Sequence, residues 1–418
     1  MSVTRKHTAK LCAAFLLGWL ACTGAAAQTA HWVGSWACSQ QQPEPQNALA
    51  PEDLRDATLR EVVHLSIGGD QIRMHISNAF GSEPLHLTAV HVARPGTERG
   101  TIDGSIDAST DRALTFGGKP DVTVPAGAEY ISDPIAFPVA AFSDLAVSLH
   151  YDQPPAQQTG HPGSRATSYV VRGDKVSSAR LDDVKRVEHW YQVSGVDVLA
   201  PAQAAAIVTL GDSITDGHGS TTDGNNRWPD LLARRLHSDS RLSTMSVLNE
   251  GIGGNRLLLD GLGPNALARF DRDVLAQPGV RYLIVLEGVN DLGMLTRDHD
   301  ASSSEHDALV HNILSAYQQI ALRAHAHGVR VIGATILPYD GSDYYHPGPA
   351  NEADRQTINQ WIQSATDFDG VVDFDAVTRD PAHPSRLLPA FDSGNHLHPS
   401  PAGYKAMGEA IPFTLFLH

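Results

Sequence analysis

Cysteine is scarce in this sequence, whose 418 residues include only Cys12, Cys22 and Cys38. Lysine and arginine (31 residues) are outnumbered by aspartate and glutamate (47 residues), and no long basic run occurs. Because nucleic-acid phosphates are bound by concentrated positive charge, this balance argues against a nucleic-acid partner. Aromatic residues make up 6% of the chain, so no obvious platform for stacking sugars stands out. Beyond the N-terminal region, no apolar run is long enough to be a transmembrane segment.

Residues 1–27 have the organisation of a secretory signal peptide, with a basic stretch, a short apolar stretch and small residues ending at Ala27. We expect cleavage after Ala27 and a secreted or periplasmic protein. Lipoprotein cleavage before Cys22 is an alternative, although the residues before Cys22 fit that signal poorly. Removal of residues 1–27 leaves Cys38 without a partner, which excludes an intramolecular disulfide and favours a buried, unreactive side chain.

Residues 28–200 are expected to form an antiparallel β-sandwich domain with a jelly-roll-like arrangement. Short stretches alternate apolar with polar residues and are separated by Gly, Pro, Asp and Asn, a pattern typical of strands and turns. Residues 193–206 are expected to connect this domain to the next. The predicted strands are 59–67, 71–78, 85–93, 113–116, 121–126 and 145–151.

Residues 201–418 show a different pattern, in which unbroken apolar runs alternate with helical segments. Such runs are typical of buried parallel strands, so we expect a doubly wound α/β domain with a five-stranded parallel sheet. The predicted strands are 204–210, 243–249, 281–287, 329–336 and 370–375. The predicted helices are 227–236, 306–328 and 399–412, the last with Ser400 as its N-cap.

Four loops at the expected carboxyl edge of this sheet or before the last helix carry the parts needed for acyl transfer. They read "LGDSITDG" with Ser213, "NEGIGGN" with Gly254, "EGVNDLG" with Asn290 and "HLHPSPAGY" with His398. A serine hydroxyl needs a base to become a nucleophile, and His398 can serve as that base. Backbone N–H groups of Ser213 and Gly254 and the amide of Asn290 could stabilise an oxyanion.

These four blocks resemble the SGNH (GDSL-type) hydrolase superfamily, in the right order and each next to the right element. The resemblance covers about residues 204–418 and implies an SGNH/flavodoxin-like sheet. It implies Ser213 as nucleophile, His398 as base, and Gly254 and Asn290 as oxyanion donors. With "WVGSWA" in the leading β domain, the whole chain looks like bacterial secreted carbohydrate esterases and arylesterases.

Asn395 departs from the family pattern, which has an aspartate three residues before the catalytic histidine. An aspartate there orients the imidazole and stabilises its charged form. Three interpretations remain open: the amide oxygen of Asn395 accepts the ring N–H of His398; a backbone carbonyl or another acid such as Asp392 orients the ring; or the enzyme is inactive.

Neither a metal nor a cofactor is expected. Asp212 and Asp216 flank the nucleophile and are expected to brace its loop through backbone N–H groups. The histidines at 299, 306, 311, 325, 327 and 346 lack the spacing of a zinc site. The sequence therefore predicts a secreted, metal-independent serine esterase that cleaves short acyl groups, acetate first, from a small-molecule or polysaccharide substrate. The alternatives are a broader lipase-like or aryl esterase, and an inactive carbohydrate-binding protein.

Overall fold

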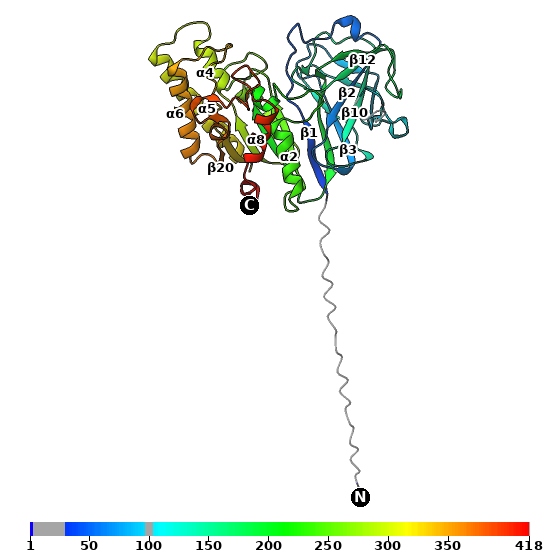
Figure 1. Ribbon diagram of the computed structural model, residues 1–418. Helices are drawn as coiled ribbons and strands as arrows, with labels where there is room; N and C mark the ends of the chain where they lie inside the picture. The colour runs from blue at the N-terminus through cyan, green and yellow to red at the C-terminus, as the bar shows by residue number, and fades with distance from the viewer. Residues whose placement is uncertain (3–29, 97–102, 418) are drawn as a thin grey trace.

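The structure, a computed structural model, describes residues 1–2, 30–96 and 103–417. The expected signal peptide therefore lies almost entirely outside the described residues. The described chain forms two lobes that pack side by side, a β domain and an α/β domain (Figure 1). No helix in the described ranges combines the length and apolar character needed to cross a membrane.

The N-terminal lobe is built from antiparallel sheets, as predicted. One sheet has the order β1-β15-β3-β8 with β9 also paired to β3, and another has the order β13-β12-β2-β10-β5-β6. The central strands β2, β10 and β15 are buried along nearly their whole length, and the apolar residues of the sheets share one hydrophobic cluster. The jelly-roll arrangement stays a prediction. The strands are β1 (His31–Ala37), β2 (Ala57–His64), β3 (Gly69–Ser77), β4 (Leu85–Leu87), β5 (Ala89–Ala93), β6 (Arg112–Ala113), β7 (Val122–Val124), β8 (Glu129–Ile131), β9 (Ile135–Val139), β10 (Asp144–Tyr151), β11 (Gly160–His161), β12 (Ser168–Arg172), β13 (Lys185–Val187), β14 (Trp190–Tyr191) and β15 (Val193–Ala200).

The prediction that residues 193–206 connect the two domains is wrong for residues 193–200. Residues 193–200 form β15, which pairs with β1 on one side and β3 on the other. Its residues are almost all buried, because β15 lies inside the sheet. The connection is the short stretch between Ala200 and Ala205, where β16 begins.

The C-terminal lobe contains the predicted five-stranded parallel sheet, with the order β17-β16-β18-β19-β20. In sequence order this is 2-1-3-4-5, the flavodoxin-like arrangement, whose ligands bind where the strand order reverses. That position lies at the carboxyl ends of β16 and β18. The strands are β16 (Ala205–Gly211), β17 (Met245–Gly251), β18 (Val280–Leu286), β19 (Arg330–Ala334) and β20 (Gly370–Val372); β21 (Arg379–Asp380) and β22 (His383–Leu387) form a small hairpin.

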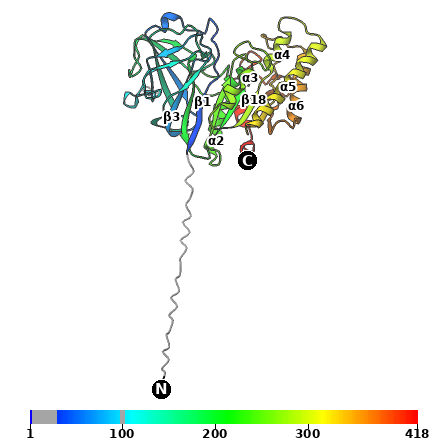
Figure 2. The ribbon, with the colours of Figure 1, turned by 180° about the vertical axis from the view of Figure 1, so that it is seen from behind.

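Helices cover both faces of the parallel sheet (Figures 1 and 2). Trp228 and Leu232 of α2 are fully buried, and α2 packs against α8. Gly328 follows the end of α5 with φ +73°, a conformation that suits glycine after a helix. The helices are α1 (Ser213–Asp216), α2 (Trp228–Ser238), α3 (Ala266–Phe270), α4 (Val289–Thr296), α5 (Ser303–Ala326), α6 (Pro349–Ser364), α7 (Phe374–Thr378) and α8 (Pro401–Ala410), with short helical turns at Pro51–Asp53, Ala108–Thr110, Asp271–Leu275 and Phe413–Phe416.

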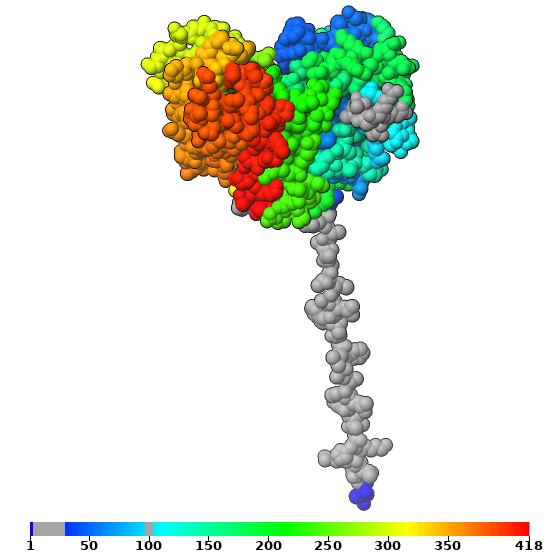
Figure 3. Space-filling view, viewed as in Figure 1, coloured from blue at the N-terminus to red at the C-terminus, as the bar shows by residue number. Residues whose placement is uncertain are grey.

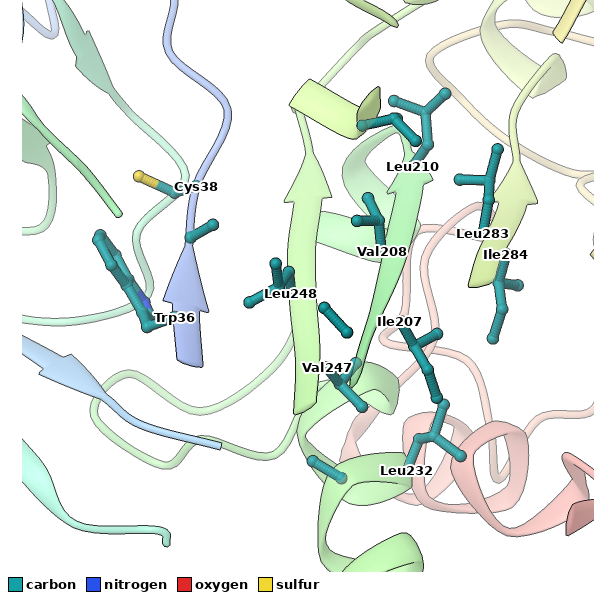
Figure 4. Packing of buried hydrophobic residues seen from close by; sticks show 14 of the residues in the cluster. Trp36, Cys38, Ile207, Val208, Leu210, Leu232, Val247, Leu248, Leu283 and Ile284 are labelled. Atoms are coloured by element: carbon teal, nitrogen blue, oxygen red, sulfur yellow. The ribbon is translucent and has the colours of Figure 1, made fainter. Parts of the chain in front are cut away.

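The two lobes share an apolar interface between β1 and β17 (Figure 4). Leu248 projects from β17 towards β1, where Gly34 leaves room for it: a Cβ on Gly34 would lie 2.9 Å from Cδ1 of Leu248. On its other face β1 contributes Trp36, which packs edge-on against Trp190 at 4.9 Å. Cys38 is buried, as expected for a small apolar side chain. The β domain is therefore part of the hydrophobic core that supports the parallel sheet.

Candidate active site

Ser213 is the first residue of α1 and follows directly after β16. The carboxylate of Asp212 accepts a hydrogen bond from the N–H of Ile214 at 2.8 Å, and so caps this short helix. Burial raises the pKa of Asp212 to about 7. The cap fixes Ser213 at the carboxyl edge of the sheet, where the strand order reverses.

His398 lies just before α8 and faces Ser213. Its Nε2 is 2.8 Å from the Oγ of Ser213, and both side chains are largely buried. The ring of His218 stacks on the ring of His398 with centroids 4.0 Å apart. Burial, together with the positive charges of His218 and Arg165, lowers the pKa of His398 to about 3. The imidazole is therefore neutral at ordinary pH and can accept a proton.

Asn395 contacts the other ring nitrogen of His398, but through its amide nitrogen and not through the expected amide oxygen. Its Oδ1 accepts hydrogen bonds from the backbone N–H groups of Leu397 (3.1 Å) and His398 (2.9 Å). These two donors fix the orientation of the amide, so Nδ2 faces Nδ1 of His398 at 2.9 Å. The interpretation in which the Asn395 oxygen accepts the ring N–H is therefore wrong for this arrangement.

The orientation of Asn395 determines the tautomer of His398. An amide N–H donates, so Nδ1 must accept, and the single ring proton resides on Nε2. Nε2 then donates to Ser213 rather than accepting its proton. A general base needs the other tautomer, with the proton on Nδ1. The site has the geometry of a Ser-His pair, but its resting tautomer is unfavourable for general-base catalysis.

Asp392, the alternative acid, does not contact His398. One carboxylate oxygen accepts from the N–H groups of Gly394 and His396, and the other lies 2.6 Å from Nδ1 of His396. The carboxylate thus braces the loop that carries Asn395. Since the amide of Asn395 occupies the Nδ1 side, neither Asp392 nor a backbone carbonyl orients His398 among the described contacts.

Asn290 is buried on α4 and is held by two hydrogen bonds. Its Oδ1 accepts from the Oη of Tyr345 at 2.6 Å, and its Nδ2 donates to the carbonyl of Asn255 at 2.7 Å. An amide nitrogen has two hydrogens, so the second N–H of Asn290 remains for a ligand in the pocket. The next residue, Asp291, caps the neighbouring loop by accepting from the N–H groups of Leu257 and Leu258.

Gly254 lines the same pocket as Asn290 and has φ +74°, a left-handed conformation that favours glycine. A Cβ there would lie 2.6 Å from Cδ1 of Leu262, so glycine is also required by space. Among the described contacts, the N–H groups of Ser213 and Gly254 have no protein acceptor. The four residues singled out from the sequence thus line one pocket, and three donors are available in it.

The pocket has a volume of about 730 Å³ and is lined by both lobes. Figure 3 shows the surface hollowed where the lobes meet at the top of the view. The β domain contributes Gln41, Glu44, Asn47, Pro162, Gly163 and Arg165, none of which the sequence analysis identified. No local motif marks these residues, because they reach the site only through the packing of one domain on the other.

Asp216 does not brace its own loop as expected. Its Oδ1 lies 2.9 Å from Nε2 of His161 in the β domain, and both side chains are fully buried. The Nδ1 of His161 in turn lies 2.8 Å from the carbonyl of Ser39. Asp216 therefore connects the nucleophile helix to the β domain. Within the described ranges, no group of three or more His, Cys, Asp or Glu side chains could hold a metal ion.

Comparison with known proteins places the α/β domain in a family. Residues 209–406 match the model of the GDSL-like Lipase/Acylhydrolase family. Similar solved structures include a lipolytic protein of the G-D-S-L family from Desulfitobacterium hafniense (23% identity, 49% of this chain, 97% of that chain, TM-score 0.37). A second is a GDSL-like lipase from Bacteroides thetaiotaomicron (21% identity, 50% of this chain, 87% of that chain, TM-score 0.34). A third is a variant of the acetyl xylan esterase Axe2 from Geobacillus stearothermophilus (19% identity, 52% of this chain, 98% of that chain, TM-score 0.37). No curated protein sequence matches the chain.

Residues 209–406 therefore carry a GDSL-like lipase/acylhydrolase domain, which confirms the resemblance drawn from the four sequence blocks. The protein is a carboxylic ester hydrolase. The identities of its catalytic residues and of its substrate are proposals, developed below.

Proposed function

We propose that this protein is an exported serine esterase that removes a short acyl group, acetate in the first place, from a carbohydrate. The observation that carries the proposal is the 2.8 Å contact between the Oγ of Ser213 and Nε2 of His398, beside donors with no protein acceptor. A serine hydroxyl in contact with a neutral imidazole is the arrangement needed for acyl transfer.

In the first half of the reaction, His398 first changes tautomer by exchange with solvent, so that Nδ1 carries the ring proton and Nε2 is free. Ser213 then attacks the acyl carbonyl and its proton moves to Nε2 of His398. The carbonyl oxygen becomes an oxyanion that accepts from the N–H groups of Ser213 and Gly254 and from Nδ2 of Asn290. The imidazolium then gives its proton to the leaving alcohol, and an acyl-Ser213 ester remains.

In the second half, water attacks the acyl-Ser213 ester. His398 takes the proton from this water, and the same three donors stabilise the second oxyanion. Collapse of the intermediate releases the carboxylic acid, and His398 returns the proton to the Oγ of Ser213. Both halves use one base and one set of donors, and neither step needs a metal.

Asn395 makes each proton transfer to His398 costly. The reactive tautomer turns the Nδ1–H of His398 towards the Nδ2–H of Asn395, so one hydrogen bond is lost and two donors face each other. A buried donor without a partner costs about 1–3 kcal/mol. Asn395 also lacks the negative charge that stabilises an imidazolium. We expect a working but slow enzyme.

The lining of the pocket supports a polar alcohol as leaving group. Gln41, Glu44 and Asn47 present amide and carboxylate groups from the β domain, and these groups are suited to sugar hydroxyls. Apolar surface makes up the larger part of the lining and includes Leu262 and Leu397. This apolar surface favours the alternative, a lipase-like enzyme with a broad acyl range, and the dependence of the rate on acyl chain length decides between the two.

The test is hydrolysis of nitrophenyl esters from acetate to octanoate by residues 28–418, with Ser213→Ala as the blank. We expect a Ser213-dependent rate that falls steeply beyond the shortest acyl groups. A rate that persists to octanoate would support the lipase-like alternative. Absence of any Ser213-dependent rate, with retained polysaccharide binding, would contradict the proposal and support a carbohydrate-binding protein.

A further inference from the structure

Arg165 lines the active-site pocket although it belongs to the β domain. It lies in the loop between β11 and β12, with φ +48°. This left-handed conformation is uncommon for residues other than glycine and marks a position that the surrounding structure determines. The backbone of this loop is therefore specified closely enough to hold a side chain at a defined place in the pocket.

Contacts with the α/β domain fasten the Arg165 loop. Arg227 donates from its guanidinium to the carbonyl of Ser164 at 2.8 Å, and the N–H of Asp223 donates to the carbonyl of Arg165 at 2.9 Å. The carboxylate of Asp223 accepts from both the N–H and the hydroxyl of Thr167, each at 2.7 Å. Arg165 is thus held relative to Ser213 rather than to the β domain alone.

The guanidinium of Arg165 lacks a protein partner. Its Nε is buried without a hydrogen-bond partner, and among the described residues no carboxylate lies within ion-pairing distance of it. The pocket's acidic side chains are engaged elsewhere or exposed: Glu44 accepts from Gln41 and Asn47, Asp216 contacts His161, and Asp343 is exposed. Arg165 as a whole is half-buried, but its Nε–H is shielded from solvent and has no partner, so this donor points to a ligand.

We propose that Arg165 binds a carboxylate carried by the substrate close to the scissile ester. A guanidinium offers parallel N–H donors that match the two oxygens of a carboxylate, and it remains charged at any working pH. The inference rests on the proposed esterase function and narrows its substrate to acidic esters. The carboxylate can belong to the alcohol part, as in a uronic acid, or to the acyl part, as in a dicarboxylic half-ester.

A bound carboxylate also changes the charge that His398 experiences. The positive charge of Arg165 lowers the pKa of both His398 and His218. During catalysis His398 becomes an imidazolium, which an unpaired Arg165 opposes. Neutralisation of Arg165 removes that opposition at the moment of proton transfer. An acidic substrate should therefore raise kcat as well as lower KM, and supply part of the negative charge that Asn395 lacks.

The test compares matched acidic and neutral esters. The alcohol-side pair is para-acetoxybenzoate and para-acetoxybenzamide; the acyl-side pair is nitrophenyl hemisuccinate and nitrophenyl isohexanoate. For at least one pair we expect kcat/KM to be about tenfold or more higher for the acid. Arg165→Gln should abolish the preference and raise kcat for the neutral ester, because the charge that opposes the imidazolium is gone. Arg165→Lys should retain part of the preference, and Arg172→Gln, an exposed arginine of the same domain, should retain all of it.

The outcomes separate this inference from the proposed function. Equal rates for both members of each pair, or an equal loss on both in Arg165→Gln, would overturn the inference while Ser213-dependent hydrolysis leaves the esterase in place. If no ester shows Ser213-dependent turnover, calorimetric titration decides. Ser213→Ala protein should then bind benzoate or succinate, and the added Arg165→Gln change should abolish this binding; no Arg165-dependent binding would contradict the inference.

Discussion

At the scale of single residues, His398 is controlled by three neighbours with different effects. Asn395 sets its tautomer, whereas His218 and Arg165 oppose its positive charge. In the usual serine-esterase arrangement a carboxylate at position 395 would counter that opposition. Here the pKa of the His398 ring is affected only by burial and by positive charge, and both lower it, so the neutral imidazole is favoured over a wide pH range.

The first prediction concerns the pH dependence of hydrolysis. The base must be neutral, and the pKa of His398 is lowered to about 3. For nitrophenyl acetate we expect kcat/KM, which reports the free enzyme, to stay level from about pH 7 down to about pH 4.5. An inflection near the ordinary histidine value of about 6.5 would contradict this. In Asn395→Asp the added carboxylate should raise the pKa and shift the acidic limb to higher pH.

The four catalytic candidates could be found from the sequence because each sits in a short motif after a strand or before a helix. His161, Arg165 and Tyr345 could not, since their roles depend on contacts between segments far apart in the chain. The orientation of the Asn395 amide also cannot be predicted from the sequence. It depends on two backbone N–H groups whose direction is set only by the folded loop.

At the scale of elements, α4 and the loop before α6 act together on the oxyanion site. Tyr345 packs against α4 so closely that a Cβ on Gly293 would lie 2.3 Å from its ring, and its hydroxyl holds the amide oxygen of Asn290. Without this hydroxyl the amide is held only by Asn255, and the free N–H loses its fixed direction.

The second prediction follows from this contact. Tyr345→Phe should lower kcat about tenfold with little change in KM, because the donor is needed most in the transition state. Tyr344→Phe is the matched control, since the hydroxyl of Tyr344 contacts Arg297 at the surface. Steady-state kinetics with nitrophenyl acetate would measure both. A proportionate loss in the two variants, or a change confined to KM, would argue against an orienting role.

The parallel strands could be predicted because buried strands are continuous apolar runs, and all five lie where the sequence indicated. Much of the β domain could not. Strands of two or three residues, such as β11 and β14, are too short for a period to show. The sequence places the connection between the domains at 193–200, although the valines of this stretch are core residues, and it does not predict α6, because polar residues dominate that helix.

At the scale of the whole molecule, the lobes are joined by polar as well as apolar contacts. Ser39 of the β domain contacts the carboxylates of Glu250 and Asp273 at 2.7 and 2.8 Å, and buried Arg269 donates to Ser39 at 2.6 Å. The pair formed by His161 and Asp216 lies nearer the active site. The β domain thus completes both the core and the pocket, and it is more than an appended binding module.

The third prediction tests this coupling. His161→Ala leaves the buried carboxylate of Asp216 without its partner and should lower the free energy of unfolding by about 3 kcal/mol or more. His86→Ala is the control, because the pair that His86 forms with Asp152 is well exposed and should contribute less than about 1 kcal/mol. Urea denaturation of both variants gives the comparison. Equal midpoints would show that the contact between the lobes contributes no more than a surface pair.

The central claim is that Ser213 and His398 form a working but restrained catalytic pair, and Asn395→Asp tests it most directly. An aspartate retains an oxygen for the N–H groups of Leu397 and His398, and offers its second oxygen to Nδ1–H, which restores the reactive tautomer. Judged by the reverse change in serine proteases, the gain in kcat should reach about a hundredfold or more.

The measurement is kcat for nitrophenyl acetate in the natural sequence and in Asn395→Asp, each with Ser213→Ala as its blank. The account predicts a small Ser213-dependent rate in the natural sequence and a large increase in the variant that Ser213→Ala abolishes. An unchanged or lower kcat in a folded Asn395→Asp protein would contradict it, because orientation and charge at His398 would then not limit the reaction.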